Sequence, residues 1–182
     1  MRKFQLTLFA IAMGLAFSAA AVTHGMSKSE YTAAKKTIEA DYKGLKAGCE
    51  PMLANAKDIC NAEAKGKNQV ARAELEAKYN PSDKTRYNVG VAKADAIFAV
   101  DKEKCDDLAG NAKDVCVKEA DAKHVAAKAD AKAHMKVVAA TKDAAGDKRD
   151  AEYAVAKEKC DALAGSSKDT CVSEAKAHFG KS

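Results

Sequence analysis

The apolar residues of this chain recur with the period of an α-helix from near residue 28 to its C-terminal end. Val91, Ala94, Phe98, Cys105 and Leu108, for example, fall along one helical face. No segment alternates between apolar and polar residues as a strand does. The pattern therefore predicts an all-α protein. The expected helices lie near 28–48, 55–79, 82–109, 112–145, 148–164 and 167–178.

Two segments outside the cysteine pairs carry helix breakers. Asn80-Pro81-Ser82 ends one helix and can cap the next, because proline stops a helix and serine is a favoured N-cap. Ala145-Gly146-Asp147 is the weaker break. A glycine costs only about 1 kcal/mol inside a helix, so one continuous bent helix is the alternative there.

Six cysteines form three pairs that recur at intervals of about 55 residues, the strongest pattern in the sequence. The paired segments read CEPMLANAKDIC, CDDLAGNAKDVC and CDALAGSSKDTC, and similar residues flank them. An aromatic residue (Tyr42, Phe98, Tyr153) stands seven positions before each first cysteine. A Glu-Ala pair starts three positions after each second one. The chain therefore contains three copies of one unit. The cysteines are Cys49, Cys60, Cys105, Cys116, Cys160 and Cys171.

The spacing within a pair predicts a turn. Residues eleven apart in one helix lie about 16 Å apart, whereas a disulfide needs Cα atoms within about 7 Å. We therefore expect each unit to be an αα-hairpin with a disulfide near its tip. Six cysteines allow fifteen pairings, so bridges between hairpins stay open at this point.

Residues inside each pair indicate where the turn falls. Gly110 and Gly165 suit the left-handed position that ends a helix, and Asn111 and Ser166 suit the N-cap of the next. Repeat 1 departs from this, since Ala54 replaces the glycine. Its Pro51 predicts that the first arm stops before Cys49.

The N-terminus has the form of a secretory signal. Arg2 and Lys3 precede an apolar run from Phe4 to Phe17, which is too short to span a bilayer, and small residues follow up to Ala21. We expect cleavage after residue 21 and a mature chain in the periplasm with no membrane span. Disulfides suit that compartment. The expected units are 1–21 (signal peptide), 22–80, 81–146 and 147–182, with the last hairpin shorter.

Composition limits the core. The chain has 41 alanines but only 29 leucine, isoleucine, valine and phenylalanine residues. Large apolar residues therefore make up less of the chain than the roughly 20% that ordinary globular domains contain. A thick α/β core with an enzyme pocket is excluded. We expect an elongated array of three disulfide-stapled hairpins with alanine-rich arms.

The sequence predicts no catalytic residue, metal site or cofactor. Asp106 and Asp107 are adjacent, but repeat 3 has Asp-Ala there, so a solvated helix face is the favoured interpretation. The four histidines are scattered, and the cysteine spacing is wider than in structural zinc sites. The balance of acidic and basic residues speaks against nucleic-acid binding.

Segments such as AKADAKAHMK and SEAKAHFGK resemble the alanine- and lysine-rich helical region of the cell-envelope protein TolA. Together with the KCDALAG-type cysteine repeats, the chain resembles small uncharacterised periplasmic proteins of Gram-negative bacteria that are often labelled TolA-like. The resemblance implies a place in the cell envelope and brings no catalytic residues.

These observations predict a non-enzymatic periplasmic protein with a structural or interaction role in the cell envelope. Its expected partners are other envelope proteins or further copies of itself. Two alternatives stay open. One is a metal- or oxidant-scavenging protein that uses reduced thiols, and the other is a chaperone-like envelope stress protein.

Overall fold

A computed structural model of the chain describes residues 25–182, and the expected signal peptide lies outside that range. The described part contains five helices and no strand, which confirms the all-α prediction. The helices are α1 (Lys28–Cys49), α2 (Ala54–Tyr79), α3 (Asp83–Cys105), α4 (Gly110–Cys160) and α5 (Gly165–Phe179).

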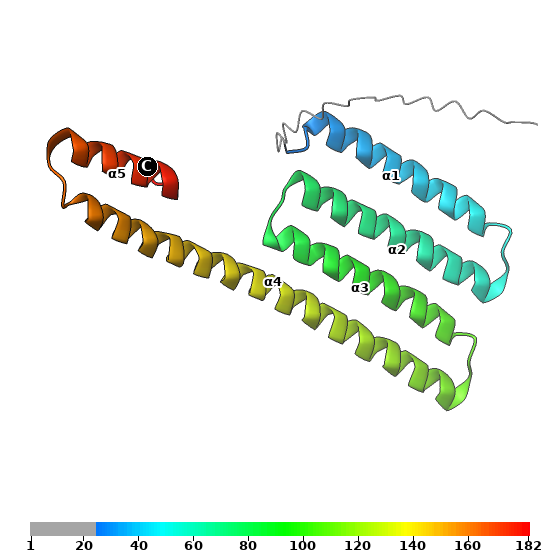
Figure 1. The fold of residues 1–182 in the computed structure, drawn as a ribbon. Helices are drawn as coiled ribbons and strands as arrows, with labels where there is room; N and C mark the ends of the chain where they lie inside the picture. The colour runs from blue at the N-terminus through cyan, green and yellow to red at the C-terminus, as the bar shows by residue number, and fades with distance from the viewer. Residues whose placement is uncertain (1–24) are drawn as a thin grey trace, which may run out of the picture.

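The first four helices lie side by side, each antiparallel to the next, in an array one helix thick (Figure 1). Each helix packs only against its neighbours in the chain: α1 on α2, α2 on α3, α3 on α4 and α4 on α5. The second half of α4 continues beyond the array, and α5 folds back along it. The elongated array of hairpins is therefore confirmed, and both faces of the four-helix row are open.

The break expected at Ala145-Gly146-Asp147 is wrong, because α4 runs through these residues as one helix of 51 residues. The boundary expected at 146/147 consequently lies inside α4, and hairpins two and three share this helix. The other break is present: α2 ends at Tyr79, and Ser82 caps α3. No proline falls in 137–148, and a single glycine costs too little to end a helix.

Helix starts fall into two kinds. Ser27 and Ser82 form capping boxes with Glu30 and Thr85 at the starts of α1 and α3. The helices that follow a cysteine-containing turn start without any side-chain cap, after Leu53, Ala109 and Ala164. In those three, a disulfide ties the first turns of the helix to its neighbour instead.

Small residues make up nearly all of the buried core in the described part. Its members are Cys49, Ala64, Leu75, Ala94, Cys105, Ala120, Cys160 and Ala175. The repeated cysteine and the alanine of each Glu-Ala pair are thus the buried positions of every repeat. Glycine brings two helix pairs into close contact, because a Cβ built on Gly66 would lie 2.7 Å from Ala96 Cβ, and one on Gly90 would lie 2.8 Å from Ala131 Cβ.

Candidate functional site

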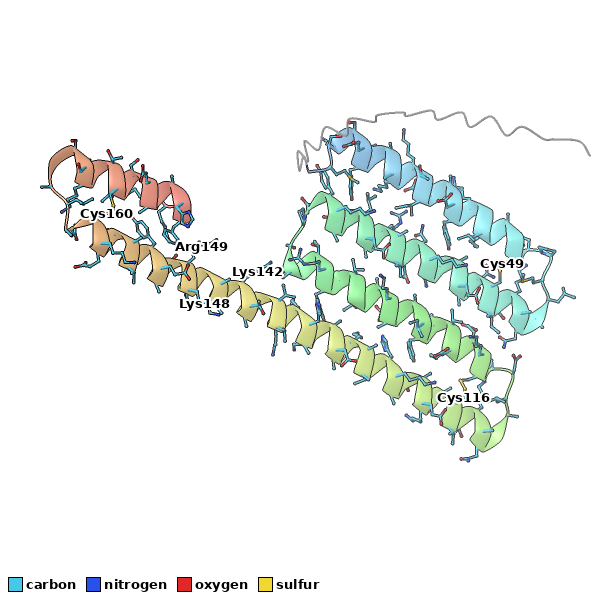
Figure 2. All side chains as sticks on the ribbon, in the orientation of Figure 1. Cys49, Cys116, Lys142, Lys148, Arg149 and Cys160 are labelled. Atoms are coloured by element: carbon cyan, nitrogen blue, oxygen red, sulfur yellow. A yellow bond between two sulfur atoms is a disulfide. The ribbon has the colours of Figure 1, made fainter. Side chains whose placement is uncertain are left out.

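Three corners of the same construction join the arms of the hairpins. The structure pairs Cys49 with Cys60, Cys105 with Cys116 and Cys160 with Cys171, at Cα–Cα distances of 5.6, 5.7 and 5.7 Å. The first cysteine of each pair is the last residue of its helix and is buried. All six cysteines are in disulfides. Figure 2 shows the corners of the first two hairpins at one end of the array and the third at the far end of α4.

Each corner reverses the chain in the same way. The backbone N–H of Met52, Leu108 or Leu163 donates to the carbonyl of the preceding cysteine three residues earlier, at 3.0–3.1 Å. The next helix then begins with a residue at positive φ: Ala54 (47°), Gly110 (57°) or Gly165 (56°).

Two expectations about the corners are wrong. The left-handed residue begins the second helix and does not end the first, so Asn111 and Ser166 lie inside helices and are not N-caps. In repeat 1, α1 continues through Cys49, since Pro51 comes two residues later and constrains only Glu50. Asn55 has another role there: its side-chain amide donates to the carbonyl of Glu103 at 2.7 Å and ties the first corner to the end of α3.

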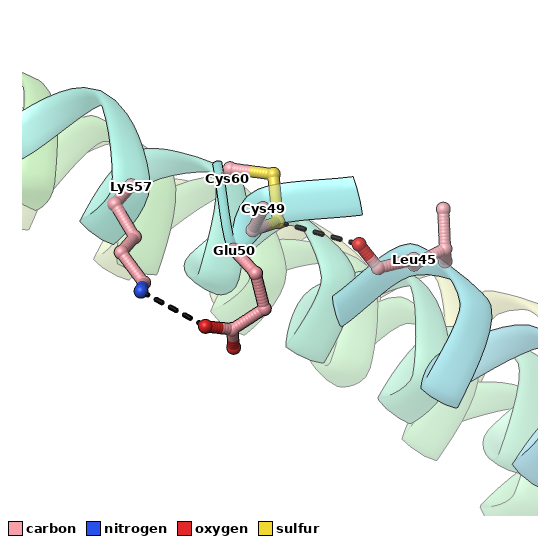
Figure 3. The surroundings of a disulfide bond; sticks show 5 residues. All are labelled: Leu45, Cys49, Glu50, Lys57 and Cys60. Carbon is pink, nitrogen blue, oxygen red and sulfur yellow. Dashed lines mark hydrogen bonds and ion pairs between the residues drawn. A yellow bond between two sulfur atoms is a disulfide. The ribbon is translucent and has the colours of Figure 1, made fainter. Parts of the chain in front are cut away.

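An ion pair crosses every corner beside the disulfide. Lys57 contacts Glu50 at 3.0 Å, Lys113 contacts Asp106 at 2.9 Å and Lys168 contacts Asp161 at 2.8 Å. Figure 3 shows the first of these next to Cys49, whose Sγ lies 3.4 Å from the carbonyl oxygen of Leu45. The Lys168 ammonium lowers the pKa of Asp161, and the Asp106 carboxylate raises the pKa of Lys113. Our reading of the sequence missed these pairs. An acid after the first cysteine of each segment and a lysine seven positions later were the available signal.

Two of the three repeated aromatic residues contact a ring of the opposite arm of their own hairpin. The Phe98 ring stacks on His124 with centroids 4.4 Å apart, and Tyr153 meets Phe179 edge to face at 6.0 Å. In the first hairpin, the residue equivalent to His124 is Asn68, which lines a groove with Tyr42. The two ring contacts hold the arms of the second and third hairpins together away from their disulfides.

His124 is the most enclosed histidine of the described part, with 17% of its side chain exposed. It is hydrogen-bonded to Asp95, and Lys128 lies 4.0 Å from the same carboxylate. This cluster joins α3 to α4. Within residues 25–182, no group of three histidine, cysteine or acidic side chains is placed to hold a metal ion. Of the adjacent Asp106 and Asp107, Asp106 forms an ion pair with Lys113 and Asp107 is exposed to solvent.

Three grooves open on one face of the array. The largest, about 570 Å³, lies between α2 and α3 and has Val70, Ile97 and Val100 in its lining. It shares Lys67 and Ala71 with the groove between α1 and α2, and Ile97 and Asp101 with a groove between α3 and α4. The three grooves therefore form one continuous surface across α1–α4, which we call the grooved face. Ile97 is 60% exposed on it.

No protein-family model, curated protein or solved structure matches this chain. The molecule itself defines a class: an all-α array of hairpin repeats with a disulfide in each corner. Three disulfides fit a secreted or extracellular protein. None of the helices in residues 25–182 is long and apolar enough to cross a membrane.

Proposed function

We propose that this protein is a non-enzymatic structural and interaction protein of the periplasm, where its disulfide-stapled array presents a surface to other proteins of the cell envelope or to further copies of itself. The observation that carries the proposal is the open grooved face. A row of helices one layer thick leaves Ile97 and Leu45 of this face exposed to water, beside grooves in which another protein could bury them.

The disulfides support this role by keeping the face in shape. Each closes a short loop and contributes about 3 kcal/mol through loop-closure entropy. A core made mainly of alanine and cysteine supplies little area, so the corners must hold the array together. The disulfides therefore keep the helices in fixed relative positions although little apolar area is buried between them.

Two experiments test this proposal. The first asks whether the protein reaches the periplasm with its cysteines oxidised, and the second asks whether the grooved face contacts other proteins. The chain with its own N-terminus is produced in a Gram-negative host, and periplasmic protein is titrated for thiols before and after reduction. We expect no reactive thiol before reduction and six after. Six free thiols on isolation, or stoichiometric bound metal, would instead support the scavenging alternative.

The contact test places a photo-crosslinking residue at Ile97, with Val125 as the control. Val125 is an exposed residue of α4 that lines none of the grooves of the grooved face. We expect discrete adducts from position 97 alone, each identified by mass spectrometry. Equal labelling from both positions, or no adduct from either, would contradict an interaction role for this face.

The apolar floor of the main groove also favours a second candidate, the shielding of unfolded chains. That candidate predicts suppression of client aggregation at low molar ratio, and its loss on Ile97→Asp. No suppression at excess protein removes it.

A further inference from the structure

The main groove between α2 and α3 is lined by one stripe from each helix. Its positions on α2 are 63, 66, 67, 70, 71 and 74, and those on α3 are 93, 96, 97, 100, 101 and 104. Both sets follow the i, i+3, i+4, i+7 spacing of a single helix face. Two helices thus turn matching faces toward the same side of the array.

The floor of this groove is low for a structural reason. Gly66 and Ala96 touch where the two helices cross, so no large side chain fills the space above them. Val70, Ile97 and Val100 stand around the resulting hollow. The groove has the form of half of a helix-bundle core.

The charges beside the groove alternate in opposite order on its two sides. Along α2, toward its C-terminal end, they run acid, base, acid: Glu63, Lys67, Glu74. Along the antiparallel α3, read in the same direction, they run base, acid, base: Lys104, Asp101, Lys93. The ion pair of Lys93 with Glu74, at 2.9 Å, joins the two stripes at one end of this pattern.

From this pattern we propose that the occupant of the grooved face is a second copy of the same chain, related by a two-fold axis that runs along the main groove. This inference rests on the proposed interaction role and names its partner. The rotation places α2 of each copy over α3 of the other at equal height. The acid-base-acid stripe of each α2 then lies over the base-acid-base stripe of the other copy's α3.

The resulting arrangement matches a known way of packing helices. The four central helices form an antiparallel four-helix bundle, because the axis is parallel to them and each α2 lies between two α3 helices of opposite direction. Ile97 of one copy then enters the hollow above Gly66 of the other. At the outer edges, α1 of each copy lies over α4 of the other, with Asp41 and Lys123 in the linings of the outer grooves.

The area is sufficient. Four helices spaced about 9 Å apart and about 33 Å long give a footprint of roughly 1,200 Å² on each copy. The two copies together bury about 2,400 Å², above the usual 1,200–2,000 Å² of stable interfaces.

The first experiment measures the mass of the purified, disulfide-bonded protein by sedimentation equilibrium across micromolar concentrations. We expect a dimer. Ile97→Asp should weaken association at least about thirtyfold, the loss typical of a central interface anchor, whereas Val125→Asp should leave it unchanged. Circular dichroism of each variant checks that the helices are retained. A wild-type monomer at every concentration, or equal loss in both variants, overturns the proposal.

The second experiment tests the two-fold geometry and does not depend on Ile97. One variant carries Glu63→Lys and Glu74→Lys, and the other carries Lys93→Glu and Lys104→Glu. Each alone brings like charges together across the axis and should be monomeric. An equimolar mixture restores opposite charges on both sides and should dimerise. Failure of the mixture to dimerise contradicts this axis.

The outcomes separate this inference from the proposed function. A monomer that gives adducts with another envelope protein from position 97 overturns the dimer alone. If the protein dimerises but its thiols are free in the periplasm, the two-fold dimer stands. The proposed role of a disulfide-stapled structural protein is then overturned.

Discussion

Ala54 stands where the other two corners have glycine, and this difference makes a quantitative prediction. Its φ is 47°, in the left-handed region that costs a residue with a Cβ about 1–2 kcal/mol. Glycine avoids that cost but loses about 0.4–1 kcal/mol through its greater freedom in the unfolded chain. Ala54→Gly should therefore stabilise the protein by about 0.8 kcal/mol, and Gly110→Ala should destabilise it by a similar amount.

The assay is urea unfolding of the disulfide-intact protein, followed by circular dichroism. With an m-value of about 2 kcal/mol/M, each substitution should move the midpoint by about 0.4 M, in opposite directions. A Cβ at Gly110 would meet nothing within 4 Å, so backbone conformation alone sets the effect.

Gly44→Ala in α1 is the matched control. This glycine is inside a helix, its Cβ would also meet nothing, and alanine is the better helix former there. The same chemical change should thus raise the midpoint at residue 44 and lower it at residue 110. If Ala54→Gly lowers the midpoint, or Gly110→Ala raises it, the assignment of the left-handed position is wrong.

Three further predictions concern packing, the third disulfide and acid. Gly66→Ala should destabilise the array by about 1–3 kcal/mol in the same urea assay, although alanine favours helices, because its Cβ would collide with Ala96; an unchanged midpoint contradicts the close contact. Replacing Cys160 and Cys171 by serine should release α5 from α4, seen as lost hydrogen-exchange protection in residues 165–179 with α1–α3 unchanged; equal loss everywhere would mean that the hairpins unfold together. The Lys142 ammonium, and then Arg86, lower the pKa of Asp83 below its ordinary 3.8. The ion pair therefore stabilises the folded protein fully at pH values above the ordinary pKa of the carboxyl group. This stabilisation is lost as the pH falls through the lowered pKa that Asp83 has in the folded protein. Carboxyl NMR titration should show this for Asp83, and Asp83→Asn should remove that part of the acid dependence.

The corners were predictable because their constraint is covalent and local. Cysteines eleven apart cannot be bridged within one helix, so the chain had to turn between them. The positions of Gly110 and Gly165 showed that a left-handed residue was needed. They did not show which helix it would belong to, since glycine is compatible with either side of a break.

The straight course of α4 was harder to predict. Gly146 disfavours a helix only weakly. Whether the helix continues through it depends on whether the segments on both sides pack against neighbouring parts of the chain. They do: Lys142 reaches Asp83 on one side of it, and Lys181 pairs with Asp150 on the other. The grooved face was not predicted either. Its charge pattern appears only when α2 and α3, whose charged groove residues are 19 or more positions apart in the sequence, are laid side by side in antiparallel order.

The unbroken α4 fixes the distance between the second and third corners of the molecule. At 1.5 Å per residue, about 66 Å separate Cys116 from Cys160 along its axis, and Lys148 and Arg149 lie between (Figure 2). Two bodies that grip the opposite corners would be held at that distance. Inserting seven residues near Gly146 would lengthen the span by about 10 Å with only about 20° of rotation. Inserting five would turn the distal hairpin to another side.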